Sequence, residues 1–391
     1  MEFETWWLLA LPLFFALGWL AARIDIKQLI TESRRLPHSY FKGLNFLLNE
    51  QPDKAIEAFI EVVKIERETV ELHFGLGSLF RRRGEVERAI RMHQTILDRE
   101  DIAPEQKLQA LFELAQDYLK AGLHDRAEDL FGKLAGTAYE QQGLRFLLEI
   151  YEQEKDWAKA IDTSRRMDEI TGKSSARDIA HFCCEIAAGE ILHARYEAAI
   201  RQLEEALSIN RKCTRANILL GDIALAQGKV GAAIGYWQRI EAQNPDYLSL
   251  LADKLLNAYE RDGRAADGLQ LLRGYLANHP SLDLLNTVFD ATLLAQGPEV
   301  AHQLLREELR RTPTLIGLLK LIEVQLTQAS PDQRHDLELV RSLVQQHTRN
   351  LALYKCDNCG FRARQFYWHC PACHGWETYV PKRTEERELA A

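Results

Sequence analysis

A small residue recurs along the chain about every 34 residues, and this period constrains the fold more than any other feature. In each copy it lies near the start of the second of two expected helices, and a second position twelve residues earlier is also often small. A two-helix unit of this length cannot bury its apolar face alone, so neighbouring units must stack. The recurring residues are Ala55, Ala89, Ala127, Ala160, Ala199, Ala233, Gly268 and Ala301, and their earlier partners are Gly43, Gly77, Ala115, Leu148, Ala187, Gly221, Leu256 and Phe289.

The residues around each small position complete a helical hairpin. In the copy spanning 77–97, Gly84 separates the two expected helices, because glycine tolerates the backbone angles of a tight turn. Pro245, Pro280 and Pro313 close the second helix in three later copies. Most copies also carry a larger residue four positions after the recurring one, namely Phe59, His93, Phe131, Leu203, Trp237, Leu272 and Leu305.

This pattern resembles the tetratricopeptide repeat, a helical hairpin of 34 residues. The match covers eight copies in phase, and a ninth, degraded copy runs from Leu315 to about His347. We therefore expect residues 38–347 to form an all-α superhelix of stacked hairpins with a concave binding surface.

Composition narrows the class of protein and the compartment. The 391 residues are 46% hydrophobic and 27% charged, which is ordinary for a folded chain. The net charge of −8 argues against nucleic acid as the main partner. Seven cysteines, four of them between 356 and 373, do not resemble a disulfide framework. They indicate a reducing compartment and a metal site.

Residues Trp6–Ala22 carry no charge, and this run of 17 residues is near the shortest that spans a bilayer. Acidic Glu2 and Glu4 precede it, whereas a secretory signal peptide begins with basic residues. We expect residues 1–22 to be a single-pass anchor whose carboxyl side faces the cytoplasm, by the positive-inside rule. The basic residues that follow are Arg23, Lys27, Arg34 and Arg35.

The alternative is a cleaved signal, which the small residues Ala21 and Ala22 would suit. If the anchor is kept, residues 23–37 form a juxtamembrane linker whose full reach is only about 50 Å. The repeats must then work close to the inner face of the membrane.

Within the repeats, two features have both a structural and a functional interpretation. The run Arg81–Arg83 either stabilises a helix end or contacts anionic head groups or an acidic partner. Cys183 and Cys184 either pack in the core or form a vicinal redox pair. His93 and His181 are expected to be ordinary repeat residues. We found no nucleophile–base pair, no phosphate-binding loop and no catalytic residue, so the body is expected to bind rather than catalyse.

Near the carboxyl end, Cys356-x-x-Cys359-Gly and Cys370-Pro-x-Cys373 form two cysteine knuckles ten residues apart. Each two-residue gap lets both thiolates face one ion, and four thiolates make a closed tetrahedral site for zinc or iron. Disulfides would instead require an oxidising compartment. We expect residues 348–382 to be a metal-binding domain and 383–391 a polar tail. His369 and His374 are left out because four cysteines fill the coordination shell.

The knuckles resemble those of rubredoxin, with a much shorter loop between them. A domain of this size cannot build a sufficient core, so the ion is expected to be structural. Its aromatic residues suggest that the domain folds back onto the concave surface of the repeats and fixes the last ones. They are Phe361, Phe366, Tyr367, Trp368 and Trp376.

An anchor, cytosolic repeats and a rubredoxin-like knot together resemble the lipopolysaccharide assembly protein B family of Gram-negative bacteria. The segments GSLFRRRGEVERAIRMHQ, AGLHDRAEDLFGKL, IAHFCCEIA and YWHCPACHGW carry the resemblance. It implies an inner-membrane adaptor that acts with the protease FtsH to promote degradation of LpxC, the deacetylase of lipid A synthesis. It also implies contacts with lipopolysaccharide-related membrane proteins. The metal ligands carried over from the family motif are Cys356, Cys359, Cys370 and Cys373.

Two other functions compete with the adaptor. One is a scaffold that gathers lipopolysaccharide enzymes at the membrane without a protease. The other is a redox protein in which the four-thiolate site carries electrons or senses oxidants. The sequence leaves open iron against zinc, and it leaves open a homodimer.

Overall fold

The computed structural model describes residues 19, 38–49, 51–65, 70–349, 351 and 353–390. The expected anchor at 1–22, of which Trp19 alone is described, and the linker at 23–37 therefore lie outside the described residues. In the described part of the chain, no helix combines the length and the apolar character needed to cross a bilayer.

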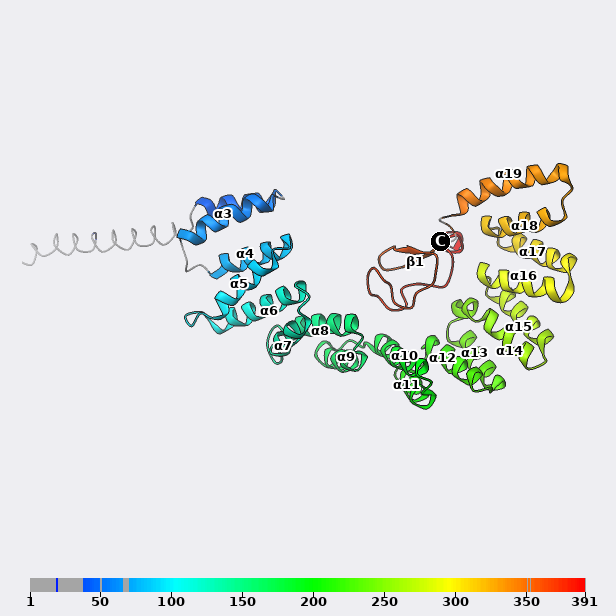
Figure 1. Cartoon of the computed structure of the whole chain (residues 1–391), viewed down its shortest axis with the longest axis horizontal. Helices are drawn as coiled ribbons and strands as arrows, with labels where there is room; N and C mark the ends of the chain where they lie inside the picture. Colours follow the sequence, from blue (N-terminus) through cyan, green and yellow to red (C-terminus); the bar gives the residue numbers. More distant parts are fainter. Residues whose placement is uncertain are drawn as a thin grey trace, which may run out of the picture. The chain divides into compact units, whose positions relative to one another are not determined.

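The described chain is mostly helical, and its contacts divide it into two compact units, unit 1 at residues 1–150 and unit 2 at residues 151–391. In unit 1 the helices pack as consecutive antiparallel neighbours, as the repeat period predicts, and α5 contacts both α4 and α6 (Figure 1). The helices are α2 (His38–Leu48), α3 (Pro52–Ile65), α4 (Val70–Arg83), α5 (Val86–Leu97), α6 (Pro104–Lys120), α7 (His124–Gly132) and α8 (Glu140–Glu154), the last of which runs across the division.

Unit 2 continues the helical pairs, and α18 and α19 lie where the sequence predicts a ninth copy. The helices are α9 (Trp157–Thr171), α10 (Ala176–Leu192), α11 (Tyr196–Ile209), α12 (Thr214–Ala226), α13 (Val230–Gln243), η2 (Pro245–Leu250), α14 (Ala252–Arg261), α15 (Ala265–Asn278), α16 (Leu282–Gln296), α17 (Pro298–Arg311), α18 (Leu315–Gln328) and α19 (Pro331–Thr348).

The spacing of small and large residues has a direct packing explanation. A Cβ atom added to Gly77 would lie less than 3.0 Å from the His93 ring, and one added to Gly221 would lie as close to the Trp237 indole. In both repeats the glycine lets the large side chain of the second helix lie flat against the first helix. Trp237 also donates its indole N–H to the carbonyl of Ile218 at 3.2 Å.

The turn within the hairpin repeats as closely as the packing does. The earlier partner position lies on the first helix of each hairpin. In six successive hairpins, the residue seven positions after it has positive φ. Four of the six are glycine, but Lys155 and Ala194 adopt the same left-handed conformation, which a side chain disfavours. The positions are Gly84, Gly122, Lys155, Ala194, Gly228 and Gly263.

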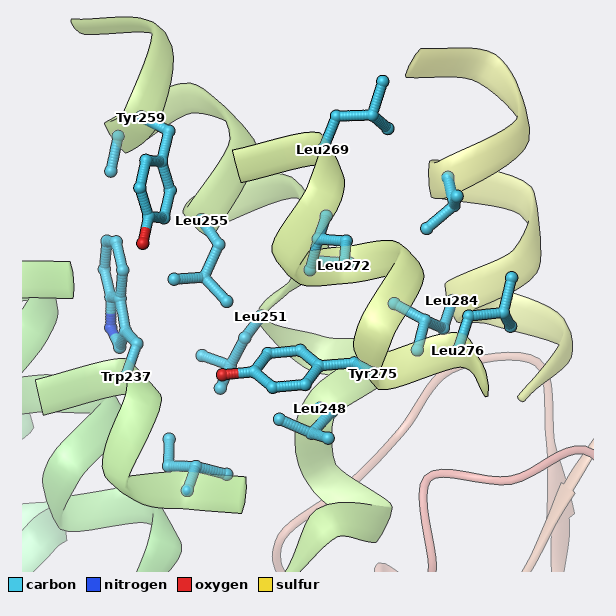
Figure 2. Close-up of a cluster of buried hydrophobic side chains, with 14 of the residues drawn as sticks. Trp237, Leu248, Leu251, Leu255, Tyr259, Leu269, Leu272, Tyr275, Leu276 and Leu284 are labelled. Carbon is cyan, nitrogen blue, oxygen red and sulfur yellow. The ribbon is translucent and has the colours of Figure 1, made fainter. Parts of the chain in front are cut away.

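Successive hairpins of unit 2 share one apolar core. Figure 2 shows the Trp237 indole of α13 beside Tyr259 and Leu255 of α14, and Tyr275 of α15 directed toward Leu251 (Figure 2). Trp237 and Leu255 are fully buried. Side chains from α13 to α16 thus fill a single space, which explains why one hairpin could not fold alone.

The carboxyl-terminal segment is not part of the repeats. Strands β1 (Tyr354–Lys355) and β2 (Arg362–Ala363) pair antiparallel, and the Cys356–Tyr379 and His369–Trp376 bridges hold the rest together. The polar tail forms a helix, α20 (Thr384–Ala390), which the sequence analysis did not predict.

Candidate metal centre and its docking face

The four knuckle cysteines converge on one point. All four sulfur atoms lie within 4.8 Å of one another, and the Cys356–Cys373 and Cys359–Cys370 sulfur pairs are each 3.7 Å apart. Zinc–thiolate bonds of about 2.3 Å place the corners of a tetrahedron about 3.8 Å apart. The donor set therefore fits a single zinc or iron ion, and His369 and His374 lie outside it.

The two knuckles are built by the same turn. The N–H of Gly360 donates to the carbonyl of Cys356 at 3.0 Å, and the N–H of His374 donates to that of Cys370 at 2.9 Å. Both turn residues have positive φ, 76° at Gly360 and 56° at His374. Gly360 takes this conformation without strain because it has no Cβ atom, whereas His374 takes it despite having a side chain.

The turns direct N–H groups at the sulfur atoms. Burial opposes ionisation of Cys356, but the Thr378 hydroxyl and the N–H groups of Cys359 and Asn358 outweigh it and lower the thiol pKa from 9.0 to about 6.

The neighbouring thiol of Cys359 behaves in the opposite way. The N–H of Phe361 lowers its pKa, but desolvation and hydrogen bonding to the other three cysteines raise it to about 12. The Cys356 thiol therefore ionises readily, and ionisation of the Cys359 thiol beside it is opposed. A bound divalent cation removes this repulsion, because its charge stabilises all four thiolates.

Aromatic side chains of the metal domain pack against the repeats of unit 2, as the sequence suggested. The Trp376 ring stacks on His181 at 5.0 Å between centroids and meets Phe182 of α10 edge-on. The Trp368 ring stacks on Tyr247 at 5.0 Å and an interplanar angle of 2°. We call this surface, Trp157, His181, Phe182, Arg215 and Tyr247, the docking face.

Not all five aromatic residues serve this contact. Phe366 joins Trp368 and meets Tyr247 edge-on, at 6.1 Å between centroids. Tyr367 packs inside the domain against Tyr379, and Phe361 is exposed. The expectation therefore holds for Phe366, Trp368 and Trp376.

Charged residues extend the contact to the last repeats. Asp283 of α16 accepts hydrogen bonds from the Tyr354 hydroxyl at 2.5 Å and from the Arg383 guanidinium at 2.8 Å. Lys382 pairs with Asp246 at 2.6 Å. The tie to Asp283 spans 100 residues of sequence, beyond the reach of any local motif.

Helix α20 supplies two glutamates that cap repeat helices. Glu385 accepts from the N–H groups of Leu315 and Ile316, at the start of α18. Glu386 accepts from the N–H of Leu282 at 2.9 Å, at the start of α16. Carboxylates at these positions satisfy unpaired amides and oppose the helix dipole, so the tail stabilises two repeats.

His181 is more than the ordinary repeat residue that the sequence indicated. It is fully buried, and its Nε2 lies 3.2 Å from a carboxylate oxygen of Glu377, at an angle that makes no hydrogen bond. Arg215 packs over the rings of Trp368 and Trp376 and pairs with Glu185. Nothing in the helical period separates such residues from core positions.

A buried charge network in unit 1 explains part of the arginine run. Arg81 pairs with Glu113 at 2.6 Å and with Asp117 at 2.8 Å, and Asp117 also contacts His93 at 2.5 Å. Asp117 and His93 are fully buried. Arg81 therefore links α4 to α6, and it is not free for an external partner.

Comparison with known proteins agrees with both parts of the chain. A family model described as rubredoxin metal binding domain matches residues 354–381, and tetratricopeptide repeat models match 42–98 and 190–254. The chain is 35% identical to lipopolysaccharide assembly protein B of Escherichia coli strain K12, over 96% of this chain and 97% of that protein.

Two further matches are more distant. The protein of the same name from Haemophilus influenzae is 30% identical, over 97% of this chain and 98% of its own length. A solved tetratricopeptide repeat protein from Parabacteroides merdae aligns with 74% of this chain and 99% of its own, at 15% identity and a TM-score of 0.33.

Proposed function

Because the chain belongs to the lipopolysaccharide assembly protein B family, we propose that it is an inner-membrane adaptor that promotes degradation of LpxC by FtsH. The observation that carries the proposal is likeness to relatives over 96% of the chain, which includes the repeats and the metal domain together. The relatives' name supports a role in lipopolysaccharide assembly.

In this proposal each part of the chain has one task. Residues 1–22 hold the protein in the inner membrane, linker 23–37 keeps the repeats close to the inner face of that membrane, and repeats 38–347 bind protein partners on the cytoplasmic side. Confinement beside other membrane proteins raises their effective concentration without any new contact. Domain 348–382 holds one ion through Cys356, Cys359, Cys370 and Cys373.

The metal centre supports an architectural role for this domain. A closed set of four thiolates leaves no open coordination position for a substrate. The ion would hold the two knuckles together, and the knuckles position Trp368 and Trp376 on the docking face. The repeats that carry the docking face then keep the arrangement that a partner recognises.

Isolation of the tagged full-length protein from detergent-solubilised membranes tests the adaptor. We expect FtsH and LpxC to co-purify, and a variant that lacks residues 1–22 to lose most of both. Lipopolysaccharide enzymes that co-purify without the protease would favour the scaffold instead. Recovery of neither protein above the level of an unrelated anchored repeat protein would contradict the proposal.

One observation supports the redox alternative. Cys359 is exposed and Cys373 is partly exposed, so one side of the sulfur cluster reaches solvent. Metal analysis of the purified protein decides between the two roles. Iron that cycles reversibly at a physiological potential would favour electron transfer, whereas zinc would remove it.

A further inference from the structure

A second thiol pair lies apart from the metal centre. The sulfur atoms of Cys184, on α10, and Cys213, just before α12, are 3.8 Å apart. Both side chains are fully buried, and both thiols are free. Cys183, the neighbour considered in the sequence, is equally buried, but it is not part of this pair. The sequence pattern places Cys213 inside a repeat but does not pair it with Cys184, which lies 29 residues away.

The two thiols have unequal acidity. Hydrogen bonding from Cys184 lowers the pKa of Cys213, and the N–H of Ala216 in the first turn of α12 adds to this effect. The hydrogen bond to Cys213 and burial raise the pKa of Cys184. Of the two thiols, Cys213 therefore carries the larger share of thiolate, which is the form that attacks an oxidant, and the Cys184 sulfur at 3.8 Å is close enough to resolve its oxidised form.

The pair lies beside the docking face. His181, one turn before Cys184 on α10, stacks on Trp376, and Arg215, two residues after Cys213, packs over Trp368 and Trp376. A change in the distance between α10 and α12 would therefore move both supports of Trp376. This position gives the pair a consequence that two thiols elsewhere in the core would lack.

We propose that Cys184 and Cys213 form a modification site at which hydrogen peroxide makes an intramolecular disulfide. The Cys213 thiolate attacks a peroxide oxygen, the O–O bond breaks, and a sulfenic acid and hydroxide result. Cys184 then attacks the Cys213 sulfur, the S–O bond breaks, and the second oxygen leaves as water. In total, two thiols and one peroxide give one disulfide and two waters.

Disulfide formation would alter the docking face. A disulfide bond is about 2.05 Å long, so the two sulfur atoms must approach by about 1.8 Å. A closely packed interior does not absorb such a shift locally. We therefore expect the start of α12 to move toward α10 and the contact of Trp376 with His181 and Arg215 to loosen. This proposal does not rest on the adaptor function.

Mass spectrometry of the metal-loaded full-length protein tests the site. The protein is treated with hydrogen peroxide, free thiols are blocked with N-ethylmaleimide, and the digest is searched for linked peptides. We expect a Cys184–Cys213 linked peptide that dithiothreitol removes. It should fall at least tenfold in Cys184→Ser and Cys213→Ser, and stay within twofold in Cys183→Ser.

Cys183→Ser is the matched control, because burial raises the pKa of this thiol to about 12 and its position on α10 adjoins Cys184. Circular dichroism checks that the variants fold, and Cys213→Ala serves if Cys213→Ser does not. Absence of the linked peptide, or linkage of Cys213 to any other cysteine, would overturn the site. Hydrogen exchange at 368–377 that is equal in the oxidised and reduced proteins would overturn its effect on docking.

Discussion

At the scale of single residues, a close neighbour on the second helix explains where a repeat needs glycine. Gly77 and Gly221 face His93 and Trp237 too closely for a Cβ atom. The equivalent position holds a fully buried alanine at Ala187 and at Ala115, and the copy of Ala115 carries Phe131 on its second helix. The sequence period therefore locates the position, but the size of the residue on the second helix does not by itself decide between glycine and alanine.

Gly221→Ala is expected to destabilise the protein by about 1–3 kcal/mol, because the methyl group would force the Trp237 indole out of place. Gly235→Ala is the control, since a Cβ atom there meets nothing within 4 Å and alanine favours a helix by about 0.5–1 kcal/mol. Thermal unfolding compares the two variants. Equal effects at both positions would show that packing against Trp237 is not the cause.

Ala194 is predicted to be a strained turn residue. Its φ of 57° costs an alanine about 1–2 kcal/mol, which exceeds the entropic cost of glycine. We expect Ala194→Gly to stabilise unit 2 by up to about 1 kcal/mol, and Ala187→Gly, inside α10, to destabilise it. Thermal unfolding measures both changes. A destabilised Ala194→Gly protein would contradict the strain.

The sequence predicted the metal ligands residue by residue, but it did not predict the residues of the docking face. Cysteine spacing located the four sulfur donors, because both halves of the site are local turns. The docking face was not predictable residue by residue, since His181, Arg215 and Tyr247 come from separate repeats. Their partners Trp368 and Trp376 come from a later domain. A helical period reports burial, but it does not report what covers the buried side chain.

At the scale of elements, the metal domain and the tail helix α20 together hold several repeats of unit 2 in place. We call this set of contacts the clamp. The aromatic rings of the metal domain contact α10 and η2, and helix α20, in the tail that follows the domain, caps α16 and α18. The repeat period predicted α18 and α19, but nothing in the polar tail predicted α20. Its two capping glutamates look like any exposed acidic pair until the amides that they satisfy are known.

Metal removal is expected to release this clamp. A chelator, or Cys370→Ser, should raise hydrogen exchange at the amides of Leu282, Leu315 and Ile316, which donate to α20. Protease digestion should then release residues 350–391. The metal-loaded protein and the Cys183→Ser control should resist both changes. Release of a folded 350–391 fragment from the metal-loaded protein would contradict the docking.

Acid should release the ion in a defined range. The pKa of Cys356 is lowered, so the stability that its thiolate contributes is fully present above pH 9.0 and is lost as the pH falls through about 6. Metal binding shifts this loss further toward acid, because protons compete with the ion. We expect retention at pH 7 and loss below pH 6, measured by metal analysis after gel filtration. Retention that does not change with pH would contradict thiolate ligation.

The ion pair between Asp283 and Arg383 is predicted to contribute strongly to the attachment of residues 350–391 to unit 2. Asp283→Ala removes the carboxylate that accepts from the Arg383 guanidinium and the Tyr354 hydroxyl, which costs about 1–3 kcal/mol. Asp290→Ala is the matched control on the same helix, because its pair with Lys320 is exposed and contributes about 0–1 kcal/mol. Both variants are digested with a protease in the absence of a chelator, and the rate at which residues 350–391 are released is compared. Equal resistance in the two variants would contradict this role.

At the scale of the whole molecule, the sequence period predicted a mostly helical chain of tetratricopeptide type, and the described residues have that fold. The period did not give the division near residue 150, because the repeat continues through it. We propose that the two units serve one adaptor held at the membrane. In this proposal the metal domain stabilises the repeats of unit 2, and the protease carries out the reaction.

The half-life of LpxC after depletion of this protein tests that claim most directly. Pulse labelling and immunoprecipitation follow LpxC in cells that express the chain from a repressible promoter. The adaptor predicts that depletion lengthens the half-life several-fold, and that the full-length protein restores it whereas a chain without residues 1–22 does not. An unchanged LpxC half-life on complete depletion would contradict the account.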